Sequence, residues 1–157
     1  MRYVLPLLFP AVFAAFAAAA QEPEAAPTLA PLVAQLARAE ALPARPLQEA
    51  HRTLPQARQR YQRGLPAGTA LYLTARVLNE AATPEPVVVR VDTWTGPRLT
   101  GRIVRLTAAG RPQAQAPVEF EEAAVLDWLL LHAGGAEEGN YLGRFLELEE
   151  RLAALQD

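Results

Sequence analysis

The sequence predicts an α+β fold in which an antiparallel sheet of about five strands packs against an N-terminal and a C-terminal helix. Apolar residues recur every three or four positions between residues 47 and 61, alternate with polar residues between 71 and 106, and return to helical spacing after 142. The first spacing is typical of an amphipathic helix, and alternation is typical of a strand. No internal repeat is visible, so we expect one helix-sheet-helix core.

The first 20 residues are typical of a secretory signal peptide. Arg2 supplies a positive charge, residues 3–20 are uncharged and mostly apolar, and Ala18-Ala19-Ala20 offers small residues to a signal peptidase. The alternative is a retained membrane anchor, but the segment carries Pro6, Pro10 and many weakly apolar alanines, and a span needs about 20 strongly apolar residues. We therefore expect cleavage after residue 20, a periplasmic or secreted protein, and no stable membrane span after cleavage.

Residues 21–45 are predicted to form a Pro/Ala-rich linker that carries a short amphipathic helix. The linker offers no bulky apolar side chain before Leu29, so its first residues bury too little surface to offset the entropy of ordering. Apolar residues then recur at helical spacing from Leu29 to Leu42, and Pro43 ends the pattern. This helix either packs on the domain or serves as a detachable docking helix, and the sequence leaves both readings open.

The globular α+β domain is expected to span residues 46–157 and to begin with a helix. Its apolar face runs from Leu47 to Tyr61, and Pro55 interrupts the pattern. Thr53, three residues before Gln56, forms a capping-box pattern in which proline is tolerated in the first turn. We therefore expect the helix to restart at Leu54 and to stop at Gly64.

Strand patterns follow from residue 71. Residues 71–77 alternate, and residues 87–94 and 99–106 flank a Thr95-Gly96-Pro97-Arg98 turn, which predicts a β-hairpin. Val118 and Phe120 indicate a further short strand.

The apolar run 125–131 predicts a last, central strand buried on both faces and ended by Gly134-Gly135. Its only interruption is Asp127. Leucines and a phenylalanine then return to helical spacing from Leu142 to Leu155, with glutamates on the outer face, and predict a closing helix.

The chain contains no cysteine, lysine or serine, and this composition excludes most common catalytic machinery. Disulfides, cysteine metal sites, catalytic thiols, serine nucleophiles, Schiff-base lysines and P-loops each need one of these residues. His51 and His132, the two histidines, lie far apart in sequence, so no metal site and no cofactor are predicted. The net charge of -2 becomes about -3 without Arg2, and no nucleic-acid partner is expected.

Charge is unevenly distributed along the chain. Residues 45–63 hold five arginines and one acid, whereas residues 119–157 hold ten acids and two arginines. Two interpretations are open. The basic helix and the acidic C-terminal region either neighbour each other or solvate separate faces, or the arginine-rich face meets an anionic envelope component or partner.

Five residues form the candidate binding set, and no residue is assigned a catalytic role: Asp127, Trp128, Asn140, Tyr141 and Arg144. A buried carboxylate such as Asp127 either accepts hydrogen bonds from amides or an arginine, or has a perturbed pKa that serves chemistry. Asn140 is suited to cap the closing helix, while the alternative is that the helix start and Arg144 hold an anion. The sequence leaves open whether these residues build the fold or a ligand site.

Several of these motifs carry a resemblance. Thr53-Leu54-Pro55, Gly101, Asp127-Trp128, and Gly139-Asn140-Tyr141 followed by Arg144 occur in this order. In that order they resemble the bacterial domain of unknown function 2314 family, over about residues 46–150. The Asp-Trp pair followed by Gly-Asn-Tyr is the specific part. The resemblance implies an α+β domain whose biochemical role is unassigned.

We expect the mature chain to be a small exported binding or interaction module whose partner is a protein or an envelope component. The alternative is a carboxylate-dependent hydrolase of the cell envelope that uses Asp127 with Glu119 or Glu121. Paired-carboxylate chemistry needs two acids in different environments at one cleft, and the sequence reveals no such cleft. A third possibility is an envelope-tethered structural protein with an uncleaved N-terminus.

Overall fold

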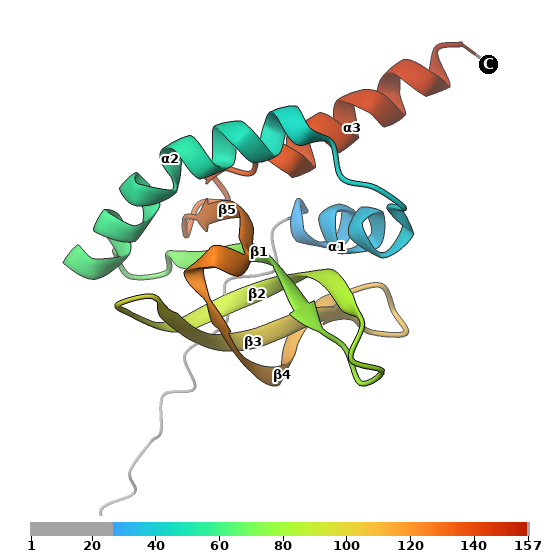
Figure 1. Cartoon of the computed structure of the whole chain (residues 1–157). Coiled ribbons are helices and arrows are strands. Elements are labelled where there is room, and N and C mark those ends of the chain that lie inside the picture. Colours follow the sequence, from blue (N-terminus) through green and yellow to red (C-terminus); the bar gives the residue numbers. More distant parts are fainter. Residues whose placement is uncertain (1–26, 157) are drawn as a thin grey trace, which may run out of the picture.

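The computed structural model describes residues 27–156, which form three α-helices, one short 3₁₀-helix (Glu122–Ala124) and a six-stranded sheet (Figure 1). The predicted signal peptide, residues 1–20, lies outside the described residues. The helices are α1 (Leu29–Arg38), α2 (Ala44–Arg63) and α3 (Tyr141–Ala154). The strands are β1 (Ala70–Leu78), β2 (Pro84–Thr95), β3 (Arg98–Leu106), β4 (Pro112–Glu121), β5 (Val125–Leu131) and β6 (Glu137–Gly139).

The sheet is antiparallel throughout, with the strand order β4-β3-β2-β1-β5-β6. This confirms the predicted fold class, with six strands in place of about five. The predicted hairpin is β2–β3, in which Thr95 pairs with Arg98 across the turn. The short strand predicted around Val118 and Phe120 extends over all ten residues of β4.

Strand β5 is buried on both faces, as predicted, but it does not lie at the centre of the sheet. It lies between β1 and the three-residue β6, and the middle of the sheet is formed by β1 and β2. An apolar run indicates that a strand is buried on both faces of the sheet. It carries no information on how many strands lie on either side of that strand. A strand as short as β6 is too brief to produce a periodic pattern.

The two faces of the sheet carry separate apolar clusters. Leu71 and Leu73 face α2 and meet Leu54, while Ala70 and Tyr72 belong to the cluster on the other face. Successive side chains of a strand point to opposite faces, so β1 is buried along most of its length because helices cover both sides.

Helix α1 packs on the domain and is part of its core. Leu29, Leu32 and Leu36 are buried against the sheet and against Leu142 of α3. Burying a leucine stabilises a fold by about 1.5 to 3 kcal/mol, so three of them hold α1 in place. The helix ends at Arg38, four residues before the predicted end at Leu42.

Helix α2 is continuous, and the predicted restart at Leu54 is wrong. Thr53 does not act as a cap, because its Oγ1 donates to the carbonyl of Glu49 at 3.0 Å within the helix. Pro55 lies on the exposed side of α2 and removes one backbone donor there. Contacts of Leu54 and Ala57 with the sheet stabilise the helix on both sides of Pro55, and α2 ends at Arg63.

None of the helices in the part of the chain described here is long and apolar enough to cross a membrane.

Candidate functional site

Asp127 fastens the start of α3 to strand β5. Its side chain is 2% exposed, Oδ2 accepts the N–H of Leu142 at 2.7 Å, and Oδ1 accepts the N–H of Trp128 at 2.7 Å. Burial raises the pKa of Asp127 to about 6, and the amides of Leu142, Trp128 and Tyr141 act in the opposite direction. Of the two sequence-based readings, the geometry matches the one in which Asp127 accepts hydrogen bonds from nearby amides.

Asn140 precedes α3 but its side chain does not cap the helix, contrary to the sequence-based prediction. Its backbone is left-handed, with φ 55 and ψ 43, whereas a capping asparagine normally has an extended backbone. The side chain packs over Gly143, where a Cβ would overlap Asn140 Oδ1, and Nδ2 donates to Glu137 Oε1 at 3.4 Å. The carboxylate of Asp127 therefore supplies the cap that Asn140 does not.

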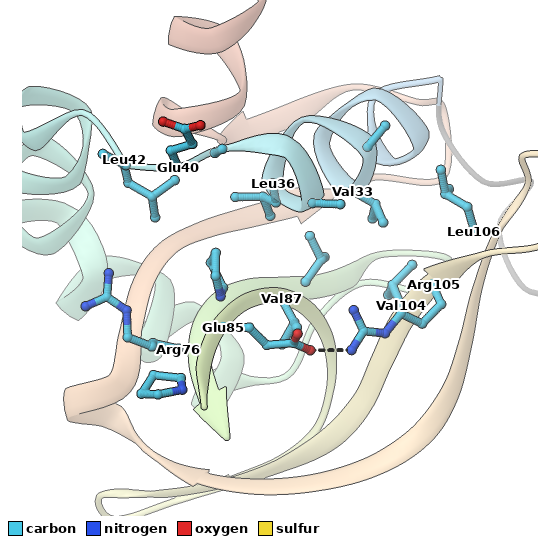
Figure 2. A pocket seen from close by; sticks show the side chains of 17 residues that line it. Val33, Leu36, Glu40, Leu42, Arg76, Glu85, Val87, Val104, Arg105 and Leu106 are labelled. Atoms are coloured by element: carbon cyan, nitrogen blue, oxygen red, sulfur yellow. Dashed lines mark hydrogen bonds and ion pairs between the residues drawn. The ribbon is translucent and has the colours of Figure 1, made fainter. Parts of the chain in front are cut away.

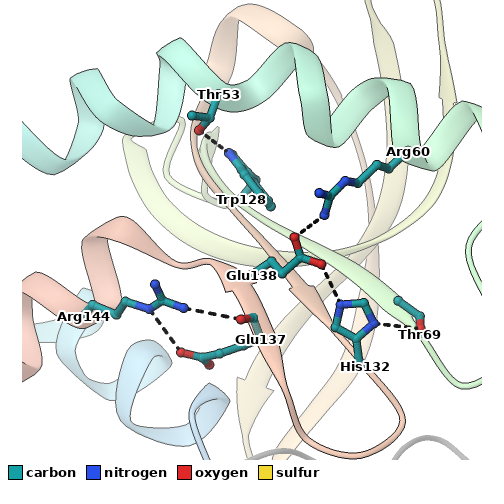
Figure 3. Close-up of polar contacts among 8 residues, drawn as sticks. All are labelled: Thr53, Arg60, Thr69, Trp128, His132, Glu137, Glu138 and Arg144. Atoms are coloured by element: carbon teal, nitrogen blue, oxygen red, sulfur yellow. Dashed lines mark hydrogen bonds and ion pairs between the residues drawn. The ribbon is translucent and has the colours of Figure 1, made fainter.

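Trp128 fills the space between β5, α2 and α3. The indole is buried, and its Nε1 donates to Thr53 Oγ1 at 2.9 Å (Figure 3). Its ring meets Tyr141 edge-on, with centroids 6.1 Å apart. A buried indole N–H without an acceptor would destabilise the fold, so Thr53 completes this contact.

Arg144 pairs with Glu137 and makes no hydrogen bond to Asp127. Its Nε lies 3.5 Å from Glu137 Oε1, and Nη2 donates to the Glu137 carbonyl at 3.4 Å (Figure 3). The structure thus brings all five candidate residues to one corner. Asp127, Trp128 and Asn140 are almost fully buried there. The carboxylate of Asp127 and the indole N–H of Trp128 are hydrogen-bonded within the fold, whereas Asn140 Oδ1 has no hydrogen-bond partner among the described residues.

A second polar cluster joins α2 to the end of the sheet. Arg60 of α2 pairs with Glu138 of β6, and Glu138 also accepts a hydrogen bond from His132 Nε2 at 2.9 Å (Figure 3). Arg60 first, and then His132, lower the pKa of Glu138. Arg58 pairs similarly with Glu122 at 3.1 Å. Arginines of the basic helix therefore do neighbour acids of the C-terminal region.

The two histidines and the two further acids named from the sequence lie apart from Asp127. His51 Nε2 donates to the Val125 carbonyl at 2.7 Å, and Glu119 pairs with Arg98 at 3.9 Å. Strand β4, which carries Glu119 and Glu121, is separated from β5 by three strands in the sheet order. Over residues 27–156 no group of three His, Cys, Asp or Glu side chains is placed to hold a metal ion.

A large cavity lies between α1 and the sheet, and we call it the α1 groove. It has a volume of about 810 Å³ and is bounded by α1, the segment 39–42 and the neighbouring parts of β1, β2 and β3 (Figure 2). Its lining includes the apolar side chains of Leu36, Val88 and Val104, all buried. Ligand pockets in proteins span roughly 300 to 1,000 Å³, so the groove is large enough for a small molecule.

Charged side chains surround this apolar lining. Glu85 and Arg105 pair with each other, which leaves Arg76 and Glu40 among the charged residues of the groove (Figure 2). Arg76 is exposed and forms no ion pair or hydrogen bond through its side chain with the residues that the structure describes. Figure 2 shows its guanidinium directed towards the side on which Leu42 and Glu40 lie.

Sequence reasoning missed the α1 groove because its residues come from distant segments. Antiparallel pairing sets Arg76 opposite Pro86 and Val88 opposite Val104, and α1 supplies the other wall. One signal was present: Val87, Val88 and Val89 are consecutive apolar residues, which indicates a strand covered on both faces and hence a helix on each side.

Comparisons with protein-family models, with curated proteins and with solved structures found no match to this chain.

Proposed function

We propose that the protein is a small exported binding module whose ligand occupies the α1 groove. The observation that carries this proposal is a cavity with both apolar and charged walls and with an unpaired arginine among its lining residues. Val33 and Leu42 are partly exposed and offer apolar surface, and Arg76 offers a cation that no described residue neutralises. Concave apolar surfaces with a few polar groups are the usual form of ligand sites.

The ligand class follows from the chemistry of this lining. An apolar body fits against the valines and leucines, and an anionic head group fits Arg76, whose planar guanidinium binds carboxylate or phosphate oxygens through two parallel hydrogen bonds. A molecule of this kind is amphiphilic and anionic, as fatty acids and many envelope lipids are. The α1 groove therefore gives chemical content to the expectation of an envelope component as partner.

Titration calorimetry with dodecanoate and with dodecanol tests the proposal on the full chain. We expect dodecanoate to bind more tightly than dodecanol. Arg76→Gln should weaken dodecanoate binding by at least about tenfold, because a charge-assisted hydrogen bond contributes roughly 1.5 to 3 kcal/mol. Dodecanol affinity should change little. Arg111→Gln is the matched control, since Arg111 is exposed and lies outside the groove.

Two results would contradict the proposal. If neither ligand binds, the α1 groove does not take amphiphiles. If Arg76→Gln and Arg111→Gln weaken dodecanoate binding equally, the anion is attracted by net charge and Arg76 does not position it.

Export is the second part of the proposal, supported by the charged, apolar and small-residue segments of the first 20 residues. The intact mass of the protein from its native envelope should correspond to a chain that begins at Gln21. A full-length mass in the membrane fraction would favour the envelope-tethered alternative. The resemblance to the domain of unknown function 2314 family stays a prediction.

A further inference from the structure

The C-terminal half of α3 carries an exposed stripe of leucines. Figure 1 shows this half extending away from the sheet towards the end marked C. Leu148 and Leu152 of α3 and Leu155, which directly follows the helix, are 54%, 51% and 83% exposed, and we call these three the α3 stripe. Their spacing of four and three places them on one face of the helix. Three neighbouring exposed leucines on a projecting helix are unusual for an isolated soluble domain.

The α3 stripe continues a heptad pattern that begins inside the domain. Tyr141 and Phe145 precede it at the same alternating spacing and are partly buried. Leu142 and Leu146 point to a different face of α3, where they pack in the cluster shared with α1. The face that carries the exposed leucines meets the core only at its start, where Tyr141 packs against Trp128. Beyond Phe145 the described residues leave this second apolar face uncovered.

The charges that flank the α3 stripe favour one arrangement of two helices. Arg144 and Arg151 lie along one edge of the stripe, and Glu149 lies along the other. When two copies of such a helix run parallel, the arginine edge of each faces the glutamate edge of its partner, so Arg144 meets Glu149. In an antiparallel pair the two arginine edges would face each other and repel.

We propose that the α3 stripe is a dimerisation surface on which a second copy of this chain packs its own α3 in parallel. The two copies are related by a twofold axis along the helices, so each stripe residue meets its counterpart. Arg144 and Arg151 now pair with Glu137 and Glu147 of their own chain, and both arginines are more than half exposed. Their long side chains can therefore also reach a glutamate on the partner.

The dimer should be reversible, because it is short. Two heptads bury less than the roughly 1,200 Å² at which stable interfaces begin, and small interfaces of this kind bind weakly. Sedimentation velocity of the full chain should therefore show a monomer that converts to a dimer as concentration rises from about 1 to 100 μM.

Leu152→Glu should raise the dissociation constant by at least about tenfold, because it places two carboxylates in the apolar contact. Leu78→Glu is the control: Leu78 is 67% exposed, lies at the end of β1, and should leave dimerisation unchanged.

Disulfide cross-linking tests the relative orientation of the two α3 helices. Because the chain has no cysteine, an introduced cysteine can pair only with its counterpart in the second copy. In a parallel pair the two copies of residue 155 face each other closely enough for a disulfide. Leu155→Cys should therefore form a covalent dimer under mild oxidation, whereas Ala153→Cys, on another face of the helix, should not. Glu149→Arg should weaken the dimer, and mixing it with Arg144→Glu should restore association.

The proposal is overturned if the unmodified chain stays monomeric throughout the concentration range, or if Leu152→Glu leaves a dimer intact. Equal cross-linking of the two cysteine variants would overturn the parallel register. Binding of the monomeric chain to phosphatidylcholine vesicles, lost in Leu152→Glu, would show that the α3 stripe meets a membrane surface and would likewise overturn the dimer.

Discussion

Replacing Asp127 with asparagine tests which of two opposing effects determines the pKa of this buried carboxyl group. Burial disfavours the charged form, whereas the amides of Leu142, Trp128 and Tyr141 favour it. The balance raises the pKa from 3.8 to about 6 in the folded protein. Asparagine has a similar shape and no charge, so it removes the titration while retaining one acceptor oxygen.

The sign and size of the effect follow from that pKa. A carboxyl group whose pKa is higher in the folded state binds its proton more tightly there than in the unfolded state. The contribution of this protonation to the free energy of unfolding is therefore fully present below pH 3.8 and is lost as pH rises through 6. Each pKa unit corresponds to about 1.4 kcal/mol, which gives a loss of about 3 kcal/mol across this window. The free energy of unfolding of the native protein should therefore fall, relative to Asp127→Asn, as pH rises.

Urea unfolding of both proteins at closely spaced pH values between 4 and 7 measures this difference. Other groups titrate equally in both chains and cancel, and the constant cost of exchanging an oxygen for an NH₂ group does not affect the slope. A difference that is flat, or that changes in the opposite direction, would refute the reasoning. It would mean that the amides at the start of α3 outweigh burial.

Two further predictions concern stability. Trp128→Ala should lower the free energy of unfolding by about 3 to 5 kcal/mol, because it empties a buried site and leaves Thr53 Oγ1 without the indole N–H; an unchanged urea midpoint would contradict this. Gly101→Ala should cost more than about 1 kcal/mol, because its Cβ would overlap the Arg90 carbonyl oxygen and lie 2.6 Å from Val89 Cγ1. Gly134→Ala, where a Cβ meets nothing within 4 Å, is the control and should be close to neutral. Thermal unfolding of both glycine variants measures the difference.

Periodic patterns in the sequence were sufficient for most of the fold. The change from helical to alternating spacing after Gly64 located β1, and the Thr95-Gly96-Pro97-Arg98 turn located the β2–β3 hairpin, because both signals are local. Where a distant contact decides the outcome, local reasoning failed. Thr53 and Gln56 match a capping pattern, but Thr53 Oγ1 accepts the indole N–H of Trp128, a residue 75 positions away in sequence. No local pattern could indicate that partner.

The candidate site shows the same division. The candidate set grouped Asp127 with residues at the start of the closing helix, and the two do lie together, because the segment that joins β5 to α3 is short and limits their separation. The identity of the cap was not predictable from it. Asn140 has the residue type of a cap, and only the left-handed backbone after Gly139 turns its side chain away from the amides. The α1 groove depends on strand order and on the docking of α1, which no local pattern encodes.

The two borders of the sheet restrict how any partner can attach. Strand β6 offers only three residues of unpaired backbone, and β4 carries Pro112 and Pro117, neither of which has an N–H to donate. An irregular register between Ile103 and Val104 further disturbs the β4 border. A peptide that binds by extending a sheet needs a long, regular row of donors and acceptors, and neither border provides one. The same features disfavour edge-to-edge association of the sheet with other chains, so we expect any partner that docks on the described residues to contact side-chain surfaces.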